Sequence, residues 1–325
     1  MKALLCKSYG LPDTLVFEET KIGPVGPGQV LINMRAAGVN FPDVLIIQNK
    51  YQFKPDLPFS PGSELSGVVA EVGEGVKHVK PGDKVVASVG HGAFAEQVLV
   101  PGNVVMPLPP EMDFETAAAF TLTYGTSHHA LKDRAALQAG ETVLVLGAAG
   151  GVGLAAIEIA KALGAKVIAA ASTAEKLAVC KAHGADELIN YSSEDLRERL
   201  KVLTGDKGPD VIYDPVGGPL AEQAFRSIAW RGRFLVVGFA NGEIPKLPFN
   251  LMLLKGASVV GVFWGSYTKR EPKDFAASIQ EMMGWMREGK IKPHISARYP
   301  LAQGAQALND MMNRKVMGKV IVTNL

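Results

Sequence analysis

A glycine-rich turn provides the clearest chemical signal in the sequence. Ala148, Gly150 and Gly153 follow the spacing A-x-G-x-x-G, and Gly147 stands immediately before them. In such a turn Gly150, Gly151 and Gly153 allow positive φ angles, let a pyrophosphate approach the backbone, and let a helix pack tightly on a strand. The pattern predicts that this turn binds the pyrophosphate of a dinucleotide.

The elements around the turn make the prediction specific. Residues 142–146 (TVLVL) are typical of a short parallel strand that is buried on both faces. A helix is expected from Val152 to Leu163, with its N-terminal N–H groups directed at the phosphate and Gly164 at its end. A second strand is expected over residues 167–171. Strand, turn, helix and strand at these distances distinguish a dinucleotide site from an ordinary glycine-rich turn.

The end of the second strand indicates which dinucleotide binds. An NAD site usually has Asp or Glu there to bind the ribose 2′-OH, and this carboxylate would repel a 2′-phosphate. Here Ala171 is followed by Ser172 and Thr173, and the first acid, Glu175, is followed by Lys176. Hydroxyls and an ammonium favour NADPH over NADH. The alternative is that Ser172 and Lys176 serve only as a helix N-cap and a solvated helix residue.

Length and composition are typical of a two-domain protein. The 325 residues exceed the usual size of a single core, and the 47% hydrophobic content is enough for two. The formal net charge is +2 without a long basic run, so no nucleic-acid partner is expected. No membrane association is expected either, because no apolar stretch has spanning length and MKALLCKSYG lacks a signal-peptide core. Cys6 and Cys180 are compatible with a reducing cytoplasm.

The chain divides into three stretches of different pattern. Residues 1–120 contain short β-like runs separated by Pro and Gly, which predict a mostly antiparallel β domain. Helical spacing begins near Asp113 and leads into residues 121–265, where strands and helices alternate as in a doubly wound parallel sheet. Residues 266–325 carry two helices and a final strand. They are too few for a core of their own, so we expect them to pack on the first domain.

Long motifs give the chain a family resemblance over almost its whole length. They include AAGVNFPDVLIIQNKY from residue 36, PGSELSGVVAEVGEGV from residue 61, PGDKVVA, the dinucleotide segment, and MGKVIV near the end. The chain resembles the medium-chain dehydrogenase/reductases of the zeta-crystallin, or quinone oxidoreductase, branch. The stretch 230–265 is similar to the quinone oxidoreductase-like proteins in particular.

The resemblance implies an architecture, a cofactor and a partner. It implies a GroES-like catalytic domain built from both chain ends, a central Rossmann domain, and NADPH as cofactor. It also implies a homodimer formed through an edge strand of the Rossmann sheet, for which residues 257–262 are the candidate.

Some relatives in this superfamily bind zinc, and this chain departs from their ligand pattern. Asn40 stands where the zinc branch has a ligating Cys, and Gly62-Ser63-Glu64 stands in place of G-H-E. Asn and Ser are poor substitutes for the thiolate and imidazole that a catalytic zinc requires. Two cysteines cannot build a four-cysteine zinc lobe, and the six histidines follow no ligand spacing. We therefore expect no metal, and a structural role is favoured for Glu64 over a general acid or base.

The resemblance also implies residue roles. For the catalytic side it implies Asn40 beside nicotinamide and substrate, Asp43 orienting that segment, and Tyr51 at the mouth of the site as a hydrogen-bond donor or stacking ring. Tyr51 could instead only pack. The expected cofactor-binding residues are Asn40, Thr126, Gly150, Gly151, Val152, Gly153, Ser172, Lys176, Tyr191, Gly238, Phe239, Phe263, Trp264 and Arg314. Lys176, Tyr191 and Arg314 are the candidates for the 2′-phosphate.

These expectations lead to a zinc-independent oxidoreductase that transfers hydride from NADPH to a quinone. Without a Lewis acid the acceptor must be electrophilic by itself, as quinones and activated alkenes are. Two alternatives stay open. One is an NADPH-dependent reductase of enone or 2-alkenal double bonds. The other is an NADPH-binding protein with little catalysis, in a structural, crystallin-like or RNA-associated role.

Overall fold

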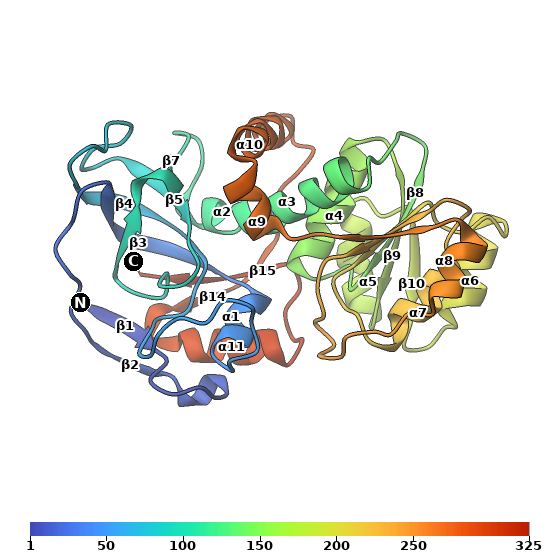
Figure 1. Cartoon of the computed structure of the whole chain (residues 1–325), viewed down its shortest axis with the longest axis horizontal. Helices are drawn as coiled ribbons and strands as arrows, with labels where there is room; N and C mark the ends of the chain where they lie inside the picture. Colours follow the sequence, from blue (N-terminus) through green and yellow to red (C-terminus); the bar gives the residue numbers. More distant parts are fainter. Residues whose placement is uncertain (325) are drawn as a thin grey trace. The chain divides into compact units, whose positions relative to one another are not determined.

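The structure is a computed structural model that describes residues 1–324. The chain forms two compact units (Figure 1). The first unit contains residues 1–122 and returns at Pro293, and the second contains Thr123–Lys292. No helix among residues 1–324 is long and apolar enough to cross a membrane.

The first unit is built on a mostly antiparallel sheet in the order β14-β15-β3-β4-β5-β7, with β6 also paired to β3. Among the described strands of this sheet, only β14 and β15 pair in parallel. Alternating buried and more exposed positions along the first half of β3 place one face of the strand in the core. The strands of the unit are β1 (Lys2–Leu5), β2 (Val16–Glu19), β3 (Gln29–Val39), β4 (Glu64–Val72), β5 (Lys84–Ser88), β6 (Gln97–Pro101), β7 (Val105–Pro107), β14 (Ile295–Pro300) and β15 (Lys319–Thr323).

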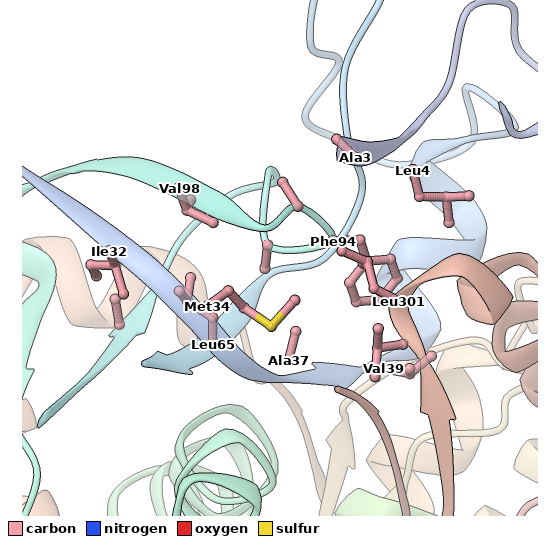
Figure 2. Close-up of a cluster of buried hydrophobic side chains, with 14 of the residues drawn as sticks. Ala3, Leu4, Ile32, Met34, Ala37, Val39, Leu65, Phe94, Val98 and Leu301 are labelled. Atoms are coloured by element: carbon pink, nitrogen blue, oxygen red, sulfur yellow. The ribbon is translucent and has the colours of Figure 1, made fainter. Parts of the chain in front are cut away.

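Short helices connect these strands, and one apolar core holds the unit together. The helices are α1 (Phe41–Ile46), α2 (Phe114–Ala118), α11 (Gly304–Met312) and the 3-10 turns Pro12–Thr14, Gly102–Val104 and Leu301–Gln303. Figure 2 shows part of the core, where Met34 and Leu65 of the sheet lie near Phe94 and Leu301. Leu301 comes from the end of the chain, so the C-terminal segment completes the core of the N-terminal strands.

The second unit contains a six-stranded parallel sheet in the order β10-β9-β8-β11-β12-β13. This is the Rossmann strand order, with the reversal between β8 and β11. The predicted fold class, a doubly wound parallel sheet with a GroES-like mostly-β domain, is confirmed. The strands are β8 (Thr142–Leu146), β9 (Lys166–Ala171), β10 (Glu187–Asn190), β11 (Val211–Asp214), β12 (Arg233–Val236) and β13 (Ser258–Gly261).

Helices connect these strands on either side of the sheet, as Figure 1 shows. They are α4 (Gly151–Ala162), α5 (Ala174–Ala182), α6 (Leu196–Thr204), α7 (Pro219–Arg226) and α8 (Phe249–Lys255), followed by α9 (Trp264–Arg270) and α10 (Pro272–Arg287). The continuous helical pattern expected after Asp113 is interrupted in the structure. It forms α2, then α3 (Thr121–His128), then a π-helical segment (His129–Arg134).

The expected boundary at residue 266 is wrong, because α9 and α10 belong to the second unit. Side-chain contacts explain this. Nε2 of His128 lies 2.7 Å from a Glu281 carboxylate oxygen, and Nζ of Lys132 lies 2.5 Å from the same carboxylate. The ring of His129 stacks on Tyr267 with centroids 3.9 Å apart. These contacts attach α9 and α10 to the segment that precedes β8, and periodicity alone does not reveal them.

Candidate functional site

In the glycine-rich turn between β8 and α4, the close packing predicted for the glycines is present, but the positive φ angles predicted for Gly150, Gly151 and Gly153 are not. Gly147 adopts φ +57°, whereas Gly150 has φ −76° and Gly151 and Gly153 are outside the positive-φ region. A Cβ at Gly153 would lie 2.6 Å from the carbonyl oxygen of Ala148. Gly153 is therefore needed for close packing of the helix on the turn, and Gly147 alone supplies the left-handed conformation.

The N-terminus of α4 is open to an anion. Its N-cap, Gly150, offers no side-chain acceptor to the first N–H groups of this 12-residue helix. The next two helices of the unit are capped differently, because Thr173 accepts from the N–H of Lys176 and Asp195 accepts from the N–H of Glu198. Uncapped N–H groups together with the helix dipole favour a phosphate at Gly150, Gly151 and Val152. The chain fits a dinucleotide pyrophosphate at this place.

The end of β9 has the composition expected for a ribose 2′-phosphate. β9 ends at Ala171 without an acid, and Nζ of Lys176 donates to Oγ of Ser172 at 3.4 Å. The backbone N–H of Tyr191 donates to the carbonyl of Ala171 at 3.1 Å, because β10 pairs in parallel with β9. The pairing therefore places the backbone of Tyr191 at the end of β9, which is followed by Ser172 and Lys176.

Four more predicted positions follow the carboxyl ends of β12 and β13. Gly238 and Phe239 follow β12, and Phe263 and Trp264 follow β13. The indole of Trp264 packs against α3, where a Cβ at Gly125 would lie 2.7 Å from Nε1. Nε1 of Trp264 is buried and has no hydrogen-bond partner within residues 1–324. It could donate a hydrogen bond to a carboxamide or carbonyl oxygen.

In the first unit, Asn40 and Asp43 form the start of α1. Asn40 is the N-cap, and its backbone N–H donates to the Asp43 carboxylate at 2.8 Å, in a capping box. Both side chains are almost completely buried. Tyr51 is partly buried and packs against the apolar core of the unit. The structure thus places the three predicted catalytic residues in one stretch of the first unit.

The side chain of Asn40 is fully engaged inside this unit. Its Nδ2 donates to Oε1 of Glu64 at 2.9 Å, and its Oδ1 accepts from Nζ of Lys319 at 2.7 Å. Nζ of Lys319 also donates to Oε1 of Glu64 at 2.5 Å. The second oxygen of Glu64 accepts from the N–H of Leu122 at 2.9 Å. The structural role favoured for Glu64 agrees with these contacts.

Burial and charge shift the pKa values of two groups beside this cluster. Burial raises the pKa of Asp43 to about 7, against the opposing effects of the Asn40 hydrogen bond and the Lys319 charge. Burial, and then the charge of Asp43, raise the pKa of Tyr51 above its ordinary value. Tyr51 is therefore protonated at neutral pH and can donate a hydrogen bond, while Asp43 can be either protonated or charged.

The donor set near Asn40 does not fit a catalytic zinc. Of Asn40, Ser63 and Glu64, only Glu64 is an anionic ligand, and its oxygens already bind an ammonium and two N–H donors. The ammonium of Lys319 already provides a positive charge next to the Glu64 carboxylate, where a metal ion would have to bind. Within residues 1–324 no group of three or more His, Cys, Asp or Glu side chains is placed to hold a metal ion.

Two points separate the site from its sequence prediction. Arg314, a predicted phosphate ligand, belongs to the first unit, while Lys176 and Tyr191 belong to the second, so its role stays a prediction. Lys319 was not among the predicted site residues. The sequence feature that could have identified it is a lysine at the start of the apolar strand KVIVT. A lysine is almost never buried without a charged partner, so its position there indicates one.

Comparisons with known proteins agree with this geometry. Residues 26–110 match the family described as "Alcohol dehydrogenase GroES-like domain", and residues 151–283 match "Zinc-binding dehydrogenase". Quinone oxidoreductase-like protein 2 of Bos taurus is 41% identical over 323 residues, covering 99% of this chain and 92% of that relative. The quinone oxidoreductase of Rattus norvegicus is 37% identical over 325 residues, covering 99% and 97%.

A solved structure shows the same fold over the full length. The quinone oxidoreductase of Escherichia coli, described as complexed with NADPH, superposes with a TM-score of 0.94 at 30% identity and covers 100% of both chains. Two units of the predicted kinds, the turn between β8 and α4, and relatives that match along the whole chain point to one family. The chain belongs to the quinone oxidoreductase family of the medium-chain dehydrogenase/reductases.

Proposed function

We propose that this chain, an NADPH-dependent oxidoreductase of the quinone reductase kind, transfers hydride to a quinone without a catalytic metal. The observation that carries the proposal is that, in this member of the family, β9 ends without an acidic residue. There Lys176 donates to Ser172, and the backbone of Tyr191 bonds Ala171. An acidic residue there would have favoured NADH.

The cofactor would be held by residues of the second unit. The N–H groups at the start of α4 would bind the pyrophosphate, and Ser172, Lys176 and Tyr191 would bind the 2′-phosphate. Thr126, Gly238, Phe239, Phe263 and Trp264 would line the nicotinamide end. When bound, NADPH supplies a hydride, which carries two electrons and one proton equivalent.

A quinone suits a site of this composition. Its conjugated carbonyls spread the negative charge that hydride addition creates, so a metal is not required to stabilise it. Reduction to the hydroquinone consumes NADPH, the quinone and one further proton, and yields NADP⁺. Tyr51 would donate a hydrogen bond to the reduced oxygen, because its raised pKa keeps the hydroxyl protonated. The extra proton would come from water or through Tyr51.

The contacts of Glu64 support a reaction without zinc. Its carboxylate is bound to the buried ammonium of Lys319, so a metal ion would have to displace an existing cation. Addition of a strong chelator is expected to leave turnover unchanged. Loss of activity on chelation, with recovery on added zinc, would contradict this part of the proposal.

The test compares acceptors of matched size with purified protein. NADPH oxidation is followed with a panel of soluble benzoquinones and naphthoquinones, and with an enone of similar size. We expect turnover with quinones, faster than with the enone. Faster turnover of the enone would support a double-bond reductase instead. Tight NADPH binding without oxidation by any acceptor would leave the role of a binding protein.

We also propose a homodimer formed through β13, which is the last strand of the parallel sheet and, among residues 1–324, has a neighbouring strand on one side only. Exposed strand edges beside apolar side chains are unfavourable in water. Val259 on this strand and Leu253 on α8 are 42% and 80% exposed, respectively. A second copy of the same edge would cover these groups. A cytoplasmic location stays a prediction.

A further inference from the structure

Three strand ends meet at one corner of the first unit's sheet. β3 ends at Val39, directly before Asn40; β4 begins with Glu64, which pairs with Gly38; and β15 begins with Lys319, whose neighbour Val320 pairs with Val39. Glu64 is 0% and Lys319 is 3% exposed. The sheet register therefore fixes a buried carboxylate and a buried ammonium beside the turn that starts α1.

The ammonium of Lys319 uses all of its donors within this corner. It donates to Oε1 of Glu64 at 2.5 Å, to Oδ1 of Asn40 at 2.7 Å and to the carbonyl of Val39 at 3.3 Å. An ammonium has three N–H donors and no acceptor, so it selects the oxygen of the Asn40 amide. The opposite end of the amide, Nδ2, then faces Glu64. Lys319 and Glu64 together determine which way the Asn40 amide points.

We propose that Lys319 is a positioning residue, which with Glu64 clamps the Asn40 side chain and thereby fixes the turn that carries Asp43 into α1. This inference rests on the proposed function, since it concerns the geometry required for hydride acceptance. A buried ion pair adds little net stability compared with a well-packed apolar pair. Its effect here is to orient the Asn40 amide, because Oδ1 accepts from the ammonium of Lys319 and Nδ2 donates to the carboxylate of Glu64.

Steady-state kinetics with three variants test the proposal. Lys319→Met removes the charge and is expected to lower kcat for the quinone roughly 10- to 100-fold, since small misplacements of site groups have effects of this size. The Kd for NADPH should stay within about twofold, because the groups proposed to bind its pyrophosphate and 2′-phosphate, at the start of α4 and the end of β9, lie in the second unit. Lys319→Arg keeps the charge and should restore most of kcat. Lys84→Met is the matched control, an exposed lysine that begins β5 in the same sheet, and it should behave as wild type.

A double variant separates positioning from stability. Lys319→Met leaves the Glu64 carboxylate buried without a counter-charge, which destabilises the fold by itself. Glu64→Gln combined with Lys319→Met removes both charges and is expected to recover Tm. Positioning predicts that kcat stays low in this variant, because no ammonium fixes Oδ1 of Asn40. If kcat recovers together with Tm, Lys319 is only structural and the proposal is overturned.

A spectroscopic readout keeps this test independent of the proposed reaction. With ¹⁵N-labelled asparagine, the side-chain NH₂ signal of Asn40, assigned from an Asn40→Ala sample, should be protected from exchange in wild type and lose protection in the double variant. Unchanged protection would overturn the role of Lys319. Absence of quinone turnover by the wild type would instead overturn the proposed function, and the NMR comparison would still decide the role of Lys319.

Discussion

The carboxylate of Asp43 accepts a hydrogen bond of 2.8 Å from the backbone N–H of Asn40, which closes the first turn of α1. This bond joins the residue that caps the helix to a titratable group that is 2% exposed. The protonation of Asp43 is therefore coupled to the stability of the turn next to the Lys319 and Glu64 clamp.

The first prediction concerns the pH dependence of stability. The folded-state pKa of Asp43 is about 7, above the ordinary value of 3.8, so the unfolded chain releases this proton at lower pH than the folded chain. The contribution of Asp43 to the free energy of unfolding is fully present below about pH 4. It is lost as the pH rises through about 7, which lowers the free energy of unfolding by up to about 4 kcal/mol. Asp43→Asn keeps an acceptor for the Asn40 N–H and removes the titration.

Urea unfolding at several pH values checks this. The free energy of unfolding of Asp43→Asn relative to wild type should rise from pH 4 to pH 7. The control is Asp56→Asn, which makes the same change at an exposed position and should leave the difference flat. Parallel curves for wild type and Asp43→Asn would show that Asp43 does not titrate in this range.

The second prediction concerns Gly153. In Gly153→Ala the new Cβ would meet the backbone of Ala148, so α4 must shift relative to its turn. We expect NADPH binding to weaken roughly tenfold or more, because the N–H groups at the helix start would move from the phosphate. Gly284→Ala in α10 is the control, since no atom lies within 4 Å of its Cβ position. Calorimetric titration with NADPH measures both, and equal affinities would exclude α4 as the phosphate site.

The third prediction concerns cofactor choice. Lys176→Ala should weaken NADPH binding by roughly 10-fold, the size of a charge-assisted hydrogen bond, and leave NADH binding nearly unchanged. The control is Lys201→Ala on α6, where the side chain is 62% exposed. Fluorescence titrations with both nucleotides give the two ratios. Equal losses for NADPH and NADH would show that Lys176 does not contact the 2′-phosphate.

The fourth prediction concerns Tyr51. Tyr51→Phe keeps the ring that packs on the apolar core and removes the hydroxyl. If the hydroxyl donates to the reduced oxygen, kcat for a quinone should fall by roughly 10- to 100-fold while KM changes little. Tyr9→Phe, a partly exposed tyrosine of the same unit, is the matched control. Wild-type kcat in Tyr51→Phe would assign Tyr51 to packing alone.

The fifth prediction concerns assembly. Val259→Lys places a charge on the exposed face of β13 and should convert the dimer into a monomer, because a buried unpaired charge opposes association. Val202→Lys on α6 introduces the same side chain at another exposed valine, 71% exposed, and should leave the assembly unchanged. Sedimentation velocity distinguishes the two states. A wild-type protein that sediments as a monomer would contradict the proposed dimer.

The sequence by itself determined the elements that depend on local pattern. β8 was predicted with the bounds that the structure shows, and α4 within one residue at each end, because a buried parallel strand and a glycine turn have strong local signatures. The absence of an acidic residue directly after Ala171 is likewise visible in the sequence alone. The short helices α8 and α9 were missed, since their pattern is too brief to be distinguished from a loop.

Only the tertiary structure decided which distant residues share a site. Lys319 and Glu64 lie 255 positions apart, and the pairing of β15 and β4 on either side of β3 brings their charges into contact. A parallel pairing likewise places Tyr191 beside Ala171. Strand register is set by burial of whole sheet faces, a property of the assembled core and not of any segment. The sequence therefore determined the cofactor class, and the fold decided how the turn at Asn40 is held.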